Sequence, residues 1–209
     1  MKTDDLIRAL AADHPAEASP MRRLFWLAPA LLASFTLLMA TLGPRPDLMA
    51  SLGDPLSVMR FALTFLLGLS ALRAVLTLAR PEQQRGLFWP MLVVGASATG
   101  LWLWAWAATP AEGRQMAMVG KTMVYCLTTI PVLSVLPVAA LFALLRRGAV
   151  TAPLRAGLAA GLAGGGLAAA IYAIHCTEDS PLFYVTWYGL AILAVTLLSG
   201  LIGQRLLRW

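Results

Sequence analysis

Six long runs of apolar residues, each bounded by turn-forming residues, recur along the chain. Each run holds about 20 residues, the length that an α-helix needs to cross the ~30 Å hydrocarbon core of a bilayer. Because lipid offers the backbone no hydrogen-bond partners, such runs are expected to be helices. The pattern therefore predicts an all-α membrane protein, a bundle of six transmembrane helices. The expected spans are 24–42, 57–79, 87–108, 118–145, 154–175 and 182–206.

A polar segment precedes the first span. Residues 1–22 are expected to form a cytoplasmic N-terminal segment, and residues 23–209 the six-helix transmembrane domain. Within the segment, residues 3–13 predict a short helix, with Asp4 and Asp5 at the positive end of its dipole. One face carries an apolar strip at helical spacing: Leu6, Ile7 and Leu10. So short a helix is marginal alone in water, and we expect it to dock on the membrane surface, the rest of the protein or a partner.

Three glycines recur at four-residue spacing in the fifth expected span, at Gly157, Gly161 and Gly165. Glycine on one face of a membrane helix lets a neighbouring backbone approach closely. This spacing predicts tight helix packing along the fifth span.

Composition supports the membrane assignment, because 59% of the 209 residues are hydrophobic and only 12% are charged. A soluble domain has about 25% charged residues. The net charge of +6 is also compatible with nucleic-acid binding. We reject direct nucleic-acid binding, because the basic residues sit in short clusters beside apolar runs, where membrane topology explains them.

Lysine and arginine are distributed unequally between the two ends of the predicted bundle. Eleven fall on one side and two, Arg45 and Arg114, on the other. The positive-inside rule therefore predicts a multi-pass protein with both termini in the cytoplasm. Arg60 and Lys121, inside or at the limits of spans, are expected to extend toward the outer face. The eleven are Lys2, Arg8, Arg22, Arg23, Arg80, Arg85, Arg146, Arg147, Arg155, Arg205 and Arg208.

The chain has two cysteines, Cys126 and Cys176. They lie 24 residues before and 26 residues after Val150, in a helical hairpin. At about 1.5 Å of rise per residue their heights differ by only about 3 Å, so both thiols are expected at the outer end of the bundle.

Side chains that bind metals follow the second cysteine: His175, Glu178 and Asp179. Thiolate, imidazole and carboxylate together suit soft or borderline metal ions. A disulfide is a second possibility in an oxidising compartment, and simple apolar packing of cysteine is a third. Spacing alone leaves these three open.

No catalytic motif is present: no phosphate-binding loop, nucleophile elbow or helical zinc motif. We therefore expect no enzyme and no resident cofactor. A small-solute transporter or channel is an alternative, but the centres of the spans carry no ionisable residues, which such proteins usually need. A purely structural scaffold is a further alternative.

Three stretches carry a resemblance to a known family: MKTDDLIRALAAD, YCLTTIPVLSVLPVAALFALLRRGA and HCTEDSPLFYVTWYGLAI. Together they resemble the NrsF family of six-helix anti-sigma factors in the bacterial inner membrane. The resemblance implies that the N-terminal segment, with Asp4, Asp5, Leu6, Ile7 and Leu10, binds an extracytoplasmic-function sigma factor. It also implies that Cys126 and Cys176 sense oxidants or heavy metals. A heavy metal would bind only transiently, as the signal, and would not be a resident cofactor.

Overall fold

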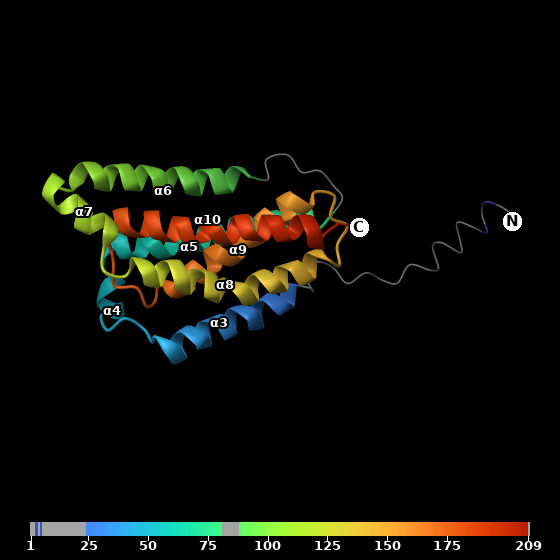
Figure 1. Ribbon diagram of the computed structural model, residues 1–209, viewed down its shortest axis with the longest axis horizontal. Helices are drawn as coiled ribbons and strands as arrows, with labels where there is room; N and C mark the ends of the chain where they lie inside the picture. The colour runs from blue at the N-terminus through green and yellow to red at the C-terminus, as the bar shows by residue number, and fades with distance from the viewer. Residues whose placement is uncertain (1–2, 4, 6–23, 81–87, 209) are drawn as a thin grey trace.

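The computed structural model describes residues 3, 5, 24–80 and 88–208, and every regular element within them is helical. The long helices run side by side as one bundle (Figure 1). In chain order the elements are the 3-10 turn η1 (Leu24–Trp26), α3 (Leu27–Thr41), α4 (Leu48–Ser51), α5 (Pro55–Leu78), α6 (Trp89–Ala108), α7 (Ala111–Val119), α8 (Met123–Leu145), α9 (Pro153–Tyr172) and α10 (Pro181–Leu206).

The six predicted spans are confirmed. Six helical segments are long and apolar enough to cross a membrane, and their limits fall within a few residues of those expected, except at the start of the fourth. Proline stands at the start of several helices, where its missing N–H costs nothing. Asp54 caps α5 as well, since its side chain accepts a hydrogen bond from the Ser57 backbone N–H at 3.0 Å.

The start of the fourth span differs from the prediction. Residues 111–119 were expected to belong mostly to a connection, but they form the short helix α7. Gly120 separates α7 from α8 because its backbone has a φ of +58°, a conformation that glycine adopts without strain. A Cβ at this position would lie 2.5 Å from the Phe183 ring, so the turn also packs closely on α10.

Helix α9 is the centre of the bundle and contacts α5, α8 and α10. In the most apolar 18-residue stretch of α9, 67% of the residues are buried, against 11% in the corresponding stretch of the peripheral α6. The predicted close packing is confirmed at Gly157, where an added Cβ would lie 2.5 Å from the Ser199 carbonyl oxygen of α10. At Gly166 it would lie 2.8 Å from the Gly68 backbone nitrogen of α5. The small residues of α9 therefore allow two neighbouring backbones to approach it.

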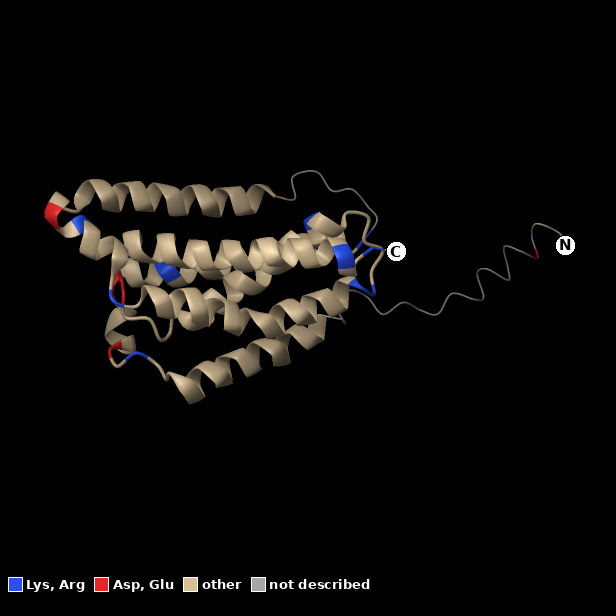
Figure 2. Cartoon of the chain, in the orientation of Figure 1, with Lys and Arg blue, Asp and Glu red and all other residues tan. Residues whose placement is uncertain are grey.

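The two ends of the bundle differ in charge (Figure 2). At one end, where α3 begins and α10 ends, the charged residues of the described bundle are arginines. Its acidic residues lie in the connections of the opposite end: Asp47, Asp54, Glu112, Glu178 and Asp179. We refer to these as the arginine end and the acidic end.

Candidate functional site

Both cysteines lie at the acidic end, in the same buried cluster. Cys126 occupies the first turn of α8, and Cys176 follows the end of α9. The backbone N–H of Cys176 donates to the Tyr172 carbonyl at 3.2 Å, which keeps the turn close to the helix. The two side chains are 0% and 1% exposed, and both are free thiols. The fold therefore brings together two cysteines that are 50 residues apart in the sequence.

Hydroxyl groups surround the two sulfur atoms. The Cys126 thiol donates to the Tyr172 hydroxyl at 3.6 Å, and the Thr122 hydroxyl lies 3.9 Å from Cys176 Sγ. The ring of Tyr188 packs on that of Tyr172 with centroids 5.6 Å apart. The Tyr188 hydroxyl and Arg60 Nε are buried without a hydrogen-bond partner among the described residues. The thiols thus lie beside a small group of buried hydroxyl groups within an otherwise apolar cluster.

Arg45 holds the loop that carries Cys176. Its Nη1 and Nη2 donate to the two carboxylate oxygens of Asp179 at 2.7 and 2.9 Å. Nη1 also donates to the backbone carbonyl of Cys176 at 3.2 Å, and Nε pairs with Asp47 at 2.7 Å. A bidentate arginine–carboxylate pair fixes geometry as well as charge. The backbone at Cys176 is therefore tied to the connection that follows α3.

Arg60 reaches the same loop from α5. Its Nη1 lies 3.2 Å from Asp179 Oδ1 and donates to the Glu178 carbonyl at 2.7 Å. Nη2 donates to the Ala173 carbonyl at 3.3 Å, and the Ser57 hydroxyl donates to Asp179 at 2.6 Å. Arg60 reaches the acidic end, but it does not extend into solvent there as predicted, because the side chain is fully buried. The loop covers the guanidinium and supplies partners for Nη1 and Nη2, so the group does not reach solvent.

These contacts change the acidity of the loop. Burial raises the pKa of Asp179, but the hydrogen bonds from Arg45 and Ser57 lower it by more, so the net shift is downward. Hydrogen bonding to Asp179 raises the pKa of Arg45 above its usual value, so the guanidinium stays charged. The pKa of Cys176 is lowered because its surroundings, the Cys126 thiol above all, favour the thiolate. The thiolate is the form of cysteine that acts as a nucleophile and as a metal ligand.

The three predicted auxiliary ligands lie around Cys176, but each has another partner. His175 Nδ1 is 2.9 Å from the Gly43 carbonyl oxygen. Glu178 Oε1 accepts from the Lys121 backbone N–H at 2.8 Å, and Asp179 pairs with the two arginines. Within residues 24–80 and 88–208, no three His, Cys, Asp or Glu side chains gather in a group that could hold a metal ion. The three predicted auxiliary ligands therefore contact other groups in this structure, and the two thiols remain as the candidate site.

Four of the five residues expected to bind a sigma factor lie outside the described residues: Asp4, Leu6, Ile7 and Leu10. Asp5 is described, and it is helical and exposed. The docking strip therefore stays a prediction.

Sequence reasoning missed the anchoring role of Arg45 and Arg60 and the tyrosines that cover the thiols. One signal was available for Arg60, because a charged residue inside an apolar span usually has a buried partner and a function. No signal was available for Tyr172 and Tyr188, which were indistinguishable from aromatic residues at a membrane interface.

The chain is similar to known proteins over its whole length. Residues 10–209 match the family described as "NrsF: Negative regulator of sigma F". The chain is 38% identical over 215 residues to the anti-sigma-F factor NrsF of Caulobacter vibrioides, and the match covers 100% of both chains. It is 33% identical over 216 residues to a probable anti-sigma-F factor NrsF of Azospira oryzae, again over 100% of both. No solved structure shows significant similarity to it.

Proposed function

Since the chain belongs to the NrsF family, we propose that it is a membrane-bound anti-sigma factor that holds an extracytoplasmic-function sigma factor and releases it under stress. Its multi-pass fold carries six candidate membrane spans. The family consists of regulators rather than enzymes, which agrees with the absence of catalytic motifs from the sequence. Family membership also favours this function over that of a small-solute transporter or channel.

The orientation that we propose puts the arginine end in the cytoplasm of a bacterial inner membrane, in keeping with the positive-inside rule. The N-terminal segment joins the bundle at Leu24, which packs in the core cluster of the arginine end with Leu144 and Leu145. A sigma factor bound by the segment is then cytoplasmic, and the thiol pair faces the periplasm. The two functions are separated by the length of the bundle.

The observation that carries this proposal is the pair of buried free thiols, Cys126 in the first turn of α8 and Cys176 in the loop held by Arg45 and Arg60. An oxidant that joins the sulfurs takes two electrons and two protons from the thiols as the S–S bond forms. A thiophilic metal ion that bridges them displaces their protons. Either change moves the start of α8 relative to the loop after α9, and α9 contacts four of the other spans, α3, α5, α8 and α10. The signal reaches the arginine end through this packing and weakens the hold on the sigma factor.

Replacement of either cysteine tests the sensor. Cys126→Ser and Cys176→Ser should each abolish stress-induced release, because one thiol can neither form the disulfide nor bridge a metal. The measurement is the amount of sigma factor that co-purifies with the membrane protein before and after treatment with an oxidant or cadmium. Both variants should retain the sigma factor fully without stress. Release from both variants at the wild-type level would show that the thiols are not the sensor.

Replacement of the apolar strip tests the docking helix. Changing Leu6, Ile7 and Leu10 to serine should free most of the sigma factor without stress, because the strip supplies the apolar contact area of the helix. The measurement is pull-down of the sigma factor, with membrane insertion checked by fractionation. The matched control changes Ala9, Ala11 and Ala12 to serine, which alters little apolar area. Full retention by the strip variant would place the binding surface elsewhere.

A further inference from the structure

A groove of about 630 Å³ runs between α8 and α10. Its walls are almost entirely apolar and include Val135, Phe142, Leu198 and Ile202. Val135 is 61% exposed and Leu198 60% exposed, so the described chain leaves the groove open along its length. In a membrane this surface faces the lipid.

The groove is shorter than the ~30 Å thickness of the hydrocarbon core. On α8 it extends from Pro131 to Arg146, 15 residues or about 22 Å at the helical rise. On α10 it extends from Val195 to Leu206, about 16 Å by the same measure. One leaflet of the hydrocarbon core is about 15 Å thick. A helix of a second copy would cross the whole core, whereas a single acyl chain needs only this length.

Arg146 stands at the mouth of the groove, at the arginine end. Its side chain is exposed, and α10 brings Arg205 and Arg208 to the same end. The acidic residues of the described bundle lie at the opposite end. Among the described residues, this end of the groove therefore carries positive charge and no carboxylate, and it complements an anionic headgroup.

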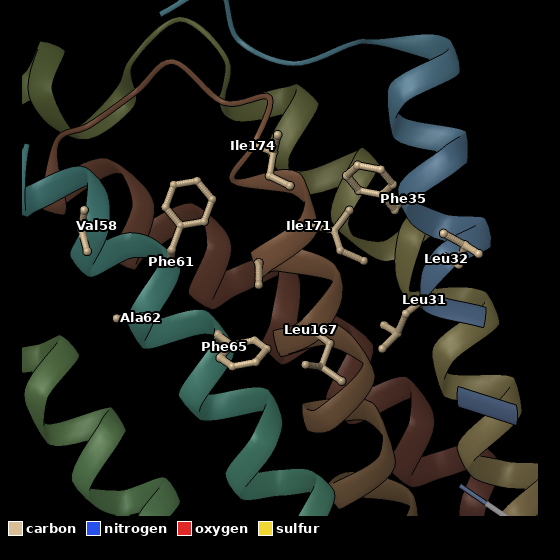
Figure 3. Close-up of a pocket in the computed structure, with 11 residues that line it drawn as sticks. Leu31, Leu32, Phe35, Val58, Phe61, Ala62, Phe65, Leu167, Ile171 and Ile174 are labelled. Atoms are coloured by element: carbon tan, nitrogen blue, oxygen red, sulfur yellow. The ribbon is translucent and has the colours of Figure 1, made fainter. Parts of the chain in front are cut away.

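A second groove supplies a natural comparison. It has a volume of about 690 Å³, lies between α3, α5 and α9, and is shown in Figure 3. Its lining includes Phe35, Phe61 and Leu167 and no charged residue. This groove can accept acyl chains of any lipid, but nothing in it distinguishes one headgroup from another.

We propose that the groove between α8 and α10 is a binding site for an anionic phospholipid. One acyl chain lies between Val135 and Leu198, and the phosphate pairs with Arg146 at the mouth. Basic residues at the mouth of an apolar groove between membrane helices are the usual receptor for anionic headgroups. The inference is independent of the thiol pair and of the sigma factor.

Native mass spectrometry of the full-length protein in detergent tests the site. The probes are dioleoyl-phosphatidylglycerol and dioleoyl-phosphatidylcholine, which have the same chains and differ in headgroup charge. The wild-type protein should retain phosphatidylglycerol about fivefold better, because its headgroup has a net negative charge whereas the choline ammonium neutralises the same phosphate, and one arginine contributes about 1 kcal/mol toward an anionic headgroup. Arg146→Gln should remove this preference, and Val135→Trp should reduce the binding of both lipids at this site by filling the groove.

Two control variants separate this site from general effects. Arg155→Gln removes an exposed arginine of the same end that does not line the groove. Ala62→Trp fills the groove of Figure 3 instead. Both should keep the preference for phosphatidylglycerol. Equal retention of the two lipids by the wild type, or an equal loss in Arg155→Gln and Arg146→Gln, would overturn the proposal. So would a dimer that Val135→Trp dissociates, because the groove would then be an interface between copies.

Discussion

Replacing Asp179 by alanine is expected to destabilise the acidic end of the bundle. The substitution leaves Arg60 buried without a carboxylate, and Arg45 keeps only Asp47. Removing one partner of a buried ion pair costs about 3–5 kcal/mol. We expect about 3 kcal/mol, the lower end of that range, because the Asp179 side chain is 34% exposed. The measurement is thermal unfolding in detergent, followed by tryptophan fluorescence.

The control for this experiment is Glu112→Ala, which removes an exposed carboxylate from the same end. It should change the unfolding temperature little, since exposed charges contribute less than about 1 kcal/mol. Equal effects of the two substitutions would show that the ion-pair cluster does not hold the loop.

The pH dependence of the cluster follows from the lowered pKa of Asp179. A carboxyl whose pKa is lowered by folding stabilises the protein above its unfolded pKa, and this contribution is lost as the pH falls through the folded value. The destabilisation by Asp179→Ala should therefore be complete at neutral pH and disappear only below the ordinary value of 3.8.

Replacing Gly166 by alanine is expected to separate α9 from α5. The new Cβ would lie 2.8 Å from the Gly68 backbone nitrogen and 3.2 Å from the Thr64 carbonyl oxygen. Backbone atoms cannot turn away as a side chain can, so the helices must move apart. Overpacking of this kind costs about 1–3 kcal/mol. The measurement is again the free energy of unfolding, together with the fraction of sigma factor retained.

Gly95→Ala and Gly189→Ala are matched controls, because a Cβ at either position meets no atom within 4 Å. Alanine is the better helix former by about 1 kcal/mol, so these two variants should be as stable as the wild type or more stable. If Gly166→Ala behaves as they do, the contact between α9 and α5 is looser than the structure describes.

Helix positions were predictable because each span must be long and apolar by itself. A membrane helix satisfies its own backbone, and its limits are marked by local signals such as Pro55, Pro153 and Pro181. The helix α7 was missed because it is short and weakly apolar, and its end depends on the conformation of Gly120.

Cys126 and Cys176 could be placed at one height from the sequence, because a hairpin of two helices translates residue number into distance. Their burial in one cluster and the hydrogen bond from Cys126 to Tyr172 could not be predicted. Those contacts depend on how each helix is rotated about its axis, and rotation is set by packing against neighbours.

The sequence by itself determined the number of long apolar spans, the unequal ends of the bundle and the similar level of the two thiols, because these follow from chain length, local composition and the rise of a helix. Only the tertiary structure decided that Arg60 is buried, that Arg45 donates a hydrogen bond to the backbone carbonyl of Cys176, and that a groove ends at Arg146. Each of these three features joins residues from different elements or connections of the bundle. Their partners are far apart in the chain, by 131 positions for Arg45 and Cys176 and 113 for Arg60 and Ala173, so no local pattern could reveal them.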